Sequence, residues 1–220
     1  MRPLQALPLR SLCAAVAVMA LSACSTPVDH VHTLLPTAAT TSEQRAEEPQ
    51  APRWLALQVI VPEALDRETW LLRGPGQQIE VHEHQRWPQP LSAELAQALA
   101  RRLDAQLAAE GWSVVPADEM PGAKRRLVVR WLAFDAWMHP TPGVHDTWLW
   151  AIECPRRRAG SPALLASGRD DYLTAGSSPS APDAFDRVAE EHAQALQQAT
   201  LAIAAAWRAQ HAGDDQRCSE

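Results

Sequence analysis

The N-terminus limits most strongly what this chain can fold into, because it carries the pattern of a secretory signal peptide. Arg2 and Arg10 give a basic start, and a short apolar run follows them. The run ends in a lipobox, the motif cleaved before a cysteine: Leu21, Ser22, Ala23 and Cys24. The Cys24 thiol would take a diacylglycerol, and the small residues before it fit a peptidase cleft. We therefore expect residues 1–23 to be removed; the alternative is an ordinary secretory signal with a chance cysteine.

A lipid on Cys24 would hold the rest of the chain at a membrane. Each buried methylene contributes about 0.8 kcal/mol, and two or more acyl chains anchor a protein stably. No later segment reaches the ~20 apolar residues of a spanning helix. We expect a globular body on a lipid tether, and Ser25 in place of aspartate favours the outer membrane, with the body facing the periplasm.

The charge of the chain argues against nucleic acid as a partner. Removal of Arg2 and Arg10 would change the formal charge from −6 to −8. Phosphate contacts need clustered Lys and Arg, and the basic runs at 124–126 and 156–158 are short. These runs are typical of solvated strand ends.

Two cysteines would stay free after processing. Cys13 leaves with the signal peptide and Cys24 is acylated, which leaves Cys154 and Cys218. In an oxidising compartment they could form a disulfide that ties the C-terminal tail to a strand. Two cysteines are a weak framework, so two unpaired thiols stay the alternative.

The composition divides the chain into four parts. After the signal peptide, residues 24–53 form a lipidated tether with a short strand and a flexible linker. The linker, Thr37 to Arg53, is rich in Thr, Glu, Gln, Ala and Pro and shows no periodicity. Residues 54–212 are long and apolar enough for one α/β domain, and 213–220 are a tail.

Apolar runs and alternating patterns predict seven strands: 54–61, 70–73, 78–84, 112–115, 126–134, 147–154 and 163–172. The first is apolar on both faces, so we place it inside a sheet. The second and third flank Gly74-Pro75-Gly76 and predict a hairpin. The last three predict an antiparallel meander.

Two helices complete the pattern. Pro90 and Gly111 bracket a stripe repeated every four residues: Leu91, Leu95, Leu99, Leu103 and Leu107. A second helix begins at Pro182 with Ser180 as its cap and ends before Gly213. Its stripe is Phe185, Val188, His192, Leu196, Ala199 and Ile203. We expect an α+β fold: a mixed or antiparallel sheet with two helices packed on one face, as a single α/β sandwich domain.

Four weak motifs in a fixed order resemble the ABC-type transport auxiliary lipoprotein family, of the paraquat-inducible protein C type. After the lipobox come Thr33-Leu34-Leu35-Pro36, then Val61–Arg67 at a strand exit, Ile79-Glu80-Val81, and Arg86–Leu91 opening the first helix. The resemblance covers nearly the whole processed chain. It departs at His30-Val31-His32, where the family has aromatic residues, at Pro88, where it has alanine, and in the long insert 37–53.

The resemblance implies a function at the cell envelope. It implies an outer-membrane lipoprotein that faces the periplasm. Its partner would be an MCE-domain or ABC-transporter protein that moves lipids between the two membranes. Some relatives assemble as homo-oligomeric rings.

The residues offer little enzyme chemistry. Glu80, His82 and His84 share one strand face with metal-ligand spacing, and His139 and His145 could add ligands. A polar strand face has the same pattern, so we expect no metal, no cofactor and no catalytic residue. The pair Asp170-Asp171 lies on a strand, where neighbouring side chains face opposite ways. A metal-dependent hydrolase and a lipid- or lipophile-binding carrier stay as alternatives to the auxiliary lipoprotein.

The nine tryptophans divide into core residues and one candidate contact. Trp131, Trp148 and Trp150 fall on predicted core faces, and Trp87 would staple a strand to the first helix. Trp137, with Met138, precedes the turn Pro140-Thr141-Pro142-Gly143. An exposed aromatic there would be a contact for a partner or for acyl chains.

Overall fold

The computed structural model describes residues 28–36, 53–154, 162–175 and 184–211. Its strands are β1 His30–Val31, β2 Arg53–Ile60, β3 Thr69–Arg73, β4 Ile79–Arg86, β5 Trp112–Pro116, β6 Arg126–Trp137, β7 Gly143–Cys154 and β8 Ala163–Ala175. Its helices are α2 Leu91–Leu107 and α3 Ala184–His211, with short 3-10 turns η1 Pro75–Gln77 and η2 Ala108–Glu110. In these residues the α+β prediction is confirmed.

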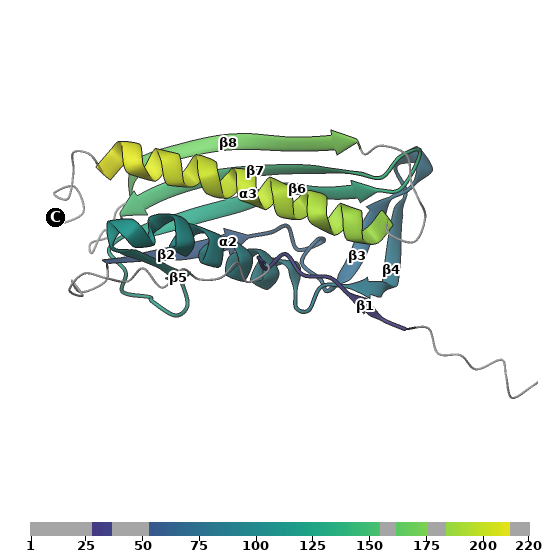
Figure 1. The fold of residues 1–220 in the computed structure, drawn as a ribbon, viewed down its shortest axis with the longest axis horizontal. Coiled ribbons are helices and arrows are strands. Elements are labelled where there is room, and N and C mark those ends of the chain that lie inside the picture. Colours follow the sequence, from purple (N-terminus) through teal and green to yellow (C-terminus); the bar gives the residue numbers. More distant parts are fainter. Residues whose placement is uncertain (1–27, 37–52, 155–161, 176–183, 212–220) are drawn as a thin grey trace, which may run out of the picture.

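The larger sheet has five strands in the order β5-β2-β6-β7-β8 (Figure 1). The predicted meander is confirmed, because β6, β7 and β8 pair antiparallel in sequence order. The run that is apolar on both faces became β2, which pairs parallel with both β5 and β6. Its place inside the sheet is thus also confirmed.

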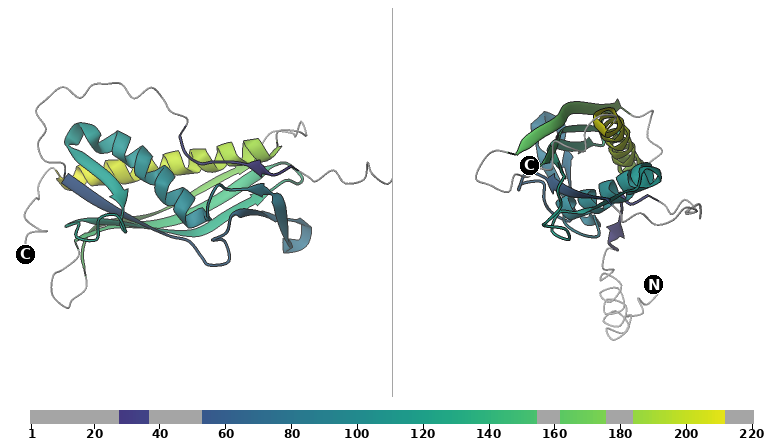
Figure 2. Two further views of the ribbon diagram at one scale, coloured as in Figure 1. Left: turned by 90° about the horizontal axis from the view of Figure 1, so that it is seen from below. Right: turned by 90° about the vertical axis from the view of Figure 1, so that its left-hand side faces the viewer.

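Both helices cover one face of this sheet, as Figure 2 shows. The predicted leucine stripe of α2 is buried, with Leu95, Leu99, Leu103 and Leu107 at 0% exposure. Alternation along the strands sends every second side chain toward these helices. The inward set on β7 is buried: Val144, Asp146, Trp148, Trp150 and Ile152. The core therefore lies between the five-stranded sheet and the helix pair.

A second, three-stranded sheet in the order β1-β4-β3 closes one end of the molecule (Figure 1). The hairpin of β3 and β4 is confirmed as antiparallel, and Gly76 in its turn has φ +70°, which suits glycine. β3 packs against β6, and Trp70 and Leu72 enter the core. The sequence pattern did not indicate this division into two sheets, because it does not say which strands pair.

All three strands of the meander are longer than predicted, and β8 ends at Ala175 where the pattern placed its end at 172. β6 continues to Trp137 and β7 begins at Gly143, where the pattern placed the ends at 134 and 147. Asp146 lies one residue before the predicted start of β7, and in the structure it is part of this strand and fully buried. Ser180 and Pro182, the linker 37–52 and the tail 213–220 lie outside the described residues. Neither helix in the described ranges is long and apolar enough to cross a membrane.

Candidate functional site

The segment 28–36 leads from the predicted lipidation site into the domain, and its Leu34 is completely buried. One carboxylate oxygen of Glu94, on α2, holds the segment in place. Glu94 Oε1 accepts hydrogen bonds from the Leu34 backbone N–H (2.7 Å) and from the Thr33 hydroxyl (2.6 Å). Oε2 accepts one from the Gln89 amide (3.1 Å). Glu94 is itself 0% exposed, so these donors replace its hydration.

The other backbone group of Leu34 is held two helical turns further on. Arg102 donates from Nη1 to the Leu34 carbonyl at 2.7 Å. Partial burial lowers the pKa of the Arg102 guanidinium from its ordinary value. Leu34, Glu94 and Arg102 thus form what we call the clamp, which satisfies both backbone groups of Leu34 from side chains of α2.

The residues before the clamp are also attached to the domain. Asp29 contacts His84 of β4 at 3.0 Å. His32 contacts Gln85 at 2.7 Å through Nε2 and Asp186 at 3.2 Å through Nδ1. The chain is therefore held from residue 29 onward, on α2, α3 and β4.

The lipobox Leu21, Ser22, Ala23 and Cys24 lies outside the described residues, and its lipidation stays a prediction. The spacing from Cys24 to Val28 nevertheless has a physical limit. Four extended residues span at most about 14 Å. A lipid on Cys24 would therefore lie within this distance of the end of the domain formed by the three-stranded sheet.

A buried ion-pair geometry joins β7 to α3. His192 Nδ1 lies 2.9 Å and 3.1 Å from the two carboxylate oxygens of Asp146, and the side chains are 2% and 0% exposed. Burial raises the pKa of the Asp146 carboxyl, and the neighbouring His192 acts in the opposite direction. The imidazole also stacks on Phe134, with ring centroids 3.8 Å apart and planes at 8°.

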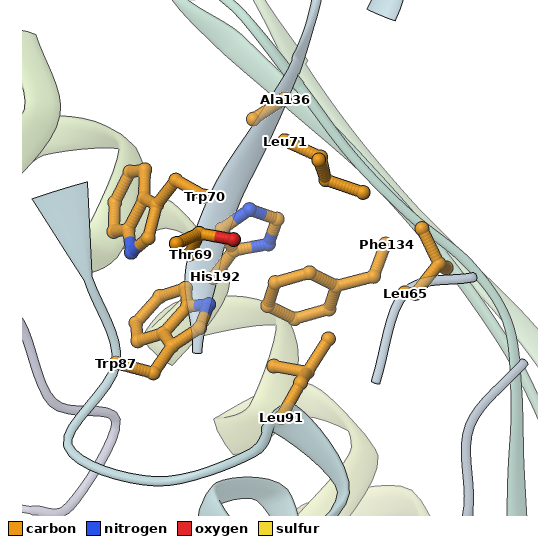
Figure 3. A pocket seen from close by; sticks show the side chains of 9 residues that line it. All are labelled: Leu65, Thr69, Trp70, Leu71, Trp87, Leu91, Phe134, Ala136 and His192. Atoms are coloured by element: carbon orange, nitrogen blue, oxygen red, sulfur yellow. The ribbon is translucent and has the colours of Figure 1, made fainter. Parts of the chain in front are cut away.

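Next to this pair lies a small cavity with aromatic walls, seen in Figure 3. Trp70, Trp87, Phe134 and His192 line it, together with aliphatic side chains. Its volume is about 20 Å³, which is room for one water molecule. Trp70 and Trp87 stack with centroids 4.6 Å apart, so Trp87 staples β3 to the start of α2 as predicted.

The metal candidates do not come together. His82 Nε2 lies 3.6 Å from Glu80, whereas His84 contacts Asp29 and His145 contacts Thr147. No three His, Cys, Asp or Glu side chains gather as a metal site within the described ranges.

The carboxylate pair on β8 also has two separate roles. Asp170 accepts a hydrogen bond from the Trp150 indole N–H (3.1 Å), and Asp171 accepts one from Thr147 (2.6 Å). The prediction that they face opposite ways is confirmed.

The tryptophans behave largely as predicted. Trp131, Trp148 and Trp150 are buried in the core. Trp137 and Met138 are half-buried. Met138 packs against the core, and Trp137 lines an open groove of about 210 Å³. A partner contact at these two residues stays a prediction.

Cys154 is disulfide-bonded. It is the one cysteine in the described residues, so its partner lies outside them. The pairing with Cys218 stays a prediction.

Comparison with known proteins gives the family. Residues 32–204 match the ABC-type transport auxiliary lipoprotein component. The chain belongs to this family. The match begins two residues before the clamp residue Leu34 and ends within α3. It contains the whole five-stranded sheet and the strands β3 and β4 of the smaller sheet, while β1 lies before it. None of the curated proteins matches the chain significantly.

Solved structures share the fold. One crystal structure of an uncharacterized protein has a TM-score of 0.55 at 18% identity and covers 80% of this chain and 99% of its own. A protein from Xanthomonas campestris has a TM-score of 0.54 at 16% identity and covers 83% of this chain and 91% of its own. At these identities the likeness concerns the fold alone.

Sequence reasoning missed both buried carboxylates of the site. No motif in the sequence gave Glu94 or Asp146 a role, and the predicted strand began one residue after Asp146. One signal was available for the clamp: Glu94 and Arg102 are eight residues apart, which places them on one face of a helix. For the Asp146–His192 pair, separated by 46 residues, no local signal exists.

Proposed function

We propose that this protein is a lipid-anchored auxiliary component of an intermembrane lipid-transport system, facing the periplasm from the outer membrane. It would hold a periplasm-spanning MCE-domain or ABC-transporter partner at that membrane. The single observation that supports this role best is the clamp on Leu34. Together with membership of the transport auxiliary lipoprotein family, it supports a domain that is held close to its lipid anchor and can bind a partner there.

Tethering acts through effective concentration. A partner that binds an anchored body is held near the membrane surface, and a short tether restricts the volume that it explores. Because the attachment of the chain to the domain begins at Asp29, only residues 24–27 separate the lipid from Val28 and the attached residues that follow it. The anchor would therefore also restrict the orientation of the body.

A carrier function is less well supported by the geometry. Sites for small molecules are usually about 300–1,000 Å³ in volume. The enclosed aromatic cavity has about 20 Å³, too little for an acyl chain. The open groove between β2 and α2 is larger, about 420 Å³, but Gln58, Asp118 and Arg126 give it polar walls. These features favour docking over carrying.

The test of this proposal replaces the predicted anchor. Intact-mass analysis of the processed wild-type protein should show an N-terminus at Cys24 that carries acyl groups. Cys24→Ala should keep the protein out of the outer-membrane fraction, because the lipobox can then be neither acylated nor cleaved before a cysteine. Ser25→Ala is the matched control and should stay in the outer membrane, whereas Ser25→Asp should favour the inner membrane. An anchored and active Cys24→Ala protein would refute the proposal.

A second experiment tests the partner. Affinity purification of the lipidated protein from detergent-solubilised membranes should recover an MCE-domain or ABC-transporter protein, and Cys24→Ala should recover less of it. The mass of the purified protein alone distinguishes a homo-oligomeric ring from a monomer. Recovery of no transport protein from intact, crosslinked envelopes would contradict the docking role.

A further inference from the structure

Half of the exposed large apolar side chains in the described residues lie at one end of this molecule. The described residues have ten such side chains. Five belong to the end that holds the three-stranded sheet (Figure 1): Val28, Val31, Ile79, Val81 and Leu173. Contiguous exposed apolar surface is typical of protein or membrane contact sites.

Three of these side chains lie on the small sheet or at its N-terminal edge. β1 pairs parallel with β4, His30 beside Gln85, and the Asp29–His84 contact extends this register by one residue. Val28, one residue further out, therefore lies near Glu83 at the edge of this sheet. Because side chains alternate along a strand, Val81 and Ile79 point to the same face of β4. The exposed fractions of Val28, Val81 and Ile79 are 73%, 51% and 54%. We call these three residues the apolar strip.

The strip continues toward the edge of the larger sheet. Ile79 is paired with Arg73 across the hairpin, so the two side chains share a face. Arg73 is bound to Asp135 at 2.9 Å, and the open groove beside this pair is lined by Trp137 and by Leu173, which is 69% exposed. The guanidinium next to the strip is thus paired with a carboxylate. Glu83, which lies between Val81 and Val28, adds one exposed carboxylate to this surface.

The length of the tether decides what covers this surface. Cys24 precedes Val28 by four residues, a distance of at most about 14 Å. Ile79 is four residues along β4 from Glu83, which lies near Val28, and a strand rises about 3.3 Å per residue. The whole strip therefore lies within about one tether length of Val28, so the tether is long enough for the predicted lipid to lie beside any part of it. This step depends on the lipidation of Cys24 that the proposed function assumes.

We propose that the apolar strip is a second membrane contact, which rests on the surface of the same bilayer that holds the lipid on Cys24. Val28, Ile79 and Val81 enter the boundary between headgroups and acyl chains. Trp137 lies beside them, at the level where tryptophan is enriched in membrane proteins. The chemistry that is recognised is an apolar lipid interface.

This contact fixes the direction of the long axis. α3 has 28 residues and is about 42 Å long, and its C-terminal end lies opposite the three-stranded sheet (Figures 1 and 2). With the strip on the membrane, that far end points into the periplasm, where a partner can reach it.

The experiment uses the processed, lipidated full-length protein in vesicles of phosphatidylethanolamine and phosphatidylglycerol. A single cysteine is introduced by Ile79→Cys or Val81→Cys and labelled with an environment-sensitive nitrobenzoxadiazole dye. Leu164→Cys and Leu201→Cys are the matched controls, because both positions are exposed (62% and 49%) and lie away from the strip. On reconstitution, emission at 79 and 81 should rise several-fold and reduction by aqueous dithionite should slow, with both unchanged at 164 and 201.

Flotation of the same vesicles separates the two proposals. If the protein floats but the labels at 79 and 81 react with dithionite as fast as the label at 164, the strip proposal is wrong and the anchor stands. If the protein does not float, the anchor proposal fails and the strip proposal fails with it. If all four labels are protected, the protein lies on the membrane without the orientation proposed here, which overturns the proposal as well.

Discussion

Two carboxylates of this protein, Glu94 and Asp146, are equally buried but are held in different ways. Both have 0% exposure. Glu94 receives its hydrogen bonds from a backbone N–H, a hydroxyl and an amide, two of them from the segment 28–36. Asp146 faces the imidazole of His192, which belongs to the core between α3 and the sheet. One carboxylate fastens a segment onto a finished domain, and the other joins two layers of that domain.

This difference indicates which part of the structure loses stability when each carboxylate or its partner is replaced. Glu94 connects α2 with a segment that carries little of the core besides Leu34. His192 pairs with β7 and stacks on Phe134 of β6, so it connects α3 with two central strands. We therefore expect changes at Glu94 to act locally and changes at the Asp146–His192 pair to act on the whole fold.

The largest effect is expected for His192→Leu. This change leaves the buried Asp146 carboxylate without its imidazole, and breaking a buried pair in this way costs about 3–5 kcal/mol. Urea unfolding followed by tryptophan fluorescence measures the free energy of unfolding. The double variant His192→Leu/Asp146→Leu is the control and should recover most of the loss, because it leaves no orphaned charge. A double variant as unstable as the single one would assign the loss to packing instead.

Glu94→Ala should have a smaller and more local effect. It leaves the Leu34 N–H and the Thr33 hydroxyl without their acceptor, at a cost of about 1–3 kcal/mol. Limited proteolysis should then cut within residues 28–36, while near-ultraviolet circular dichroism of the core tryptophans stays unchanged. Glu94→Gln keeps an acceptor oxygen, so its protease resistance should lie between that of the wild type and that of Glu94→Ala. Equal protease resistance in all three proteins would show that Arg102 and Leu34 suffice.

The same comparison explains how much of the fold the sequence could predict. The leucine stripe of α2, the hairpin and the meander were predictable, because each depends on periodicity within one segment. The parallel pairing of β2 with β5 and β6, and the separation of β1, β3 and β4 into a second sheet, were not. Pairing between distant strands depends on side-chain packing across the core, which leaves no local pattern.

The candidate site was less predictable than the fold for a related reason. Binary patterning treats Glu94, Asp146 and Arg102 as surface residues, since charged side chains are rarely buried. Their burial is possible only because partners 46 to 68 residues away in the sequence satisfy them. The lipobox, in contrast, is a contiguous motif that needs no tertiary context.

Asp146→Asn tests whether the negative charge of the buried Asp146 carboxylate destabilises the folded protein. Burial raises the pKa of Asp146 above its ordinary 3.8, so folding favours the protonated carboxyl. The stability from this group is fully present below the unfolded pKa and is lost as the pH rises through the higher folded pKa. Wild type should therefore lose stability relative to Asp146→Asn from about pH 4 upward, by up to about 1.4 kcal/mol per pH unit. Denaturant unfolding of both proteins across this range measures the difference, and a difference that is constant with pH would contradict it.

The smallest effect is expected at Tyr172, which lies directly opposite Asp146 on β8 and is bound to Glu191, the residue before His192. Burial, followed by the hydrogen bond to Glu191 at 2.9 Å, raises the pKa of Tyr172 to about 12. Because the chain has one tyrosine, phenolate absorbance reports this group alone. Glu191→Gln should move the midpoint part of the way back to 10.0, since burial, the larger cause, stays. The stability linked to this group is present below pH 10 and is lost toward pH 12. An unchanged titration midpoint in Glu191→Gln would show that burial alone raises the pKa of Tyr172. The Tyr172–Glu191 hydrogen bond would then not join β8 to α3 in the way that the Asp146–His192 pair joins β7 to α3.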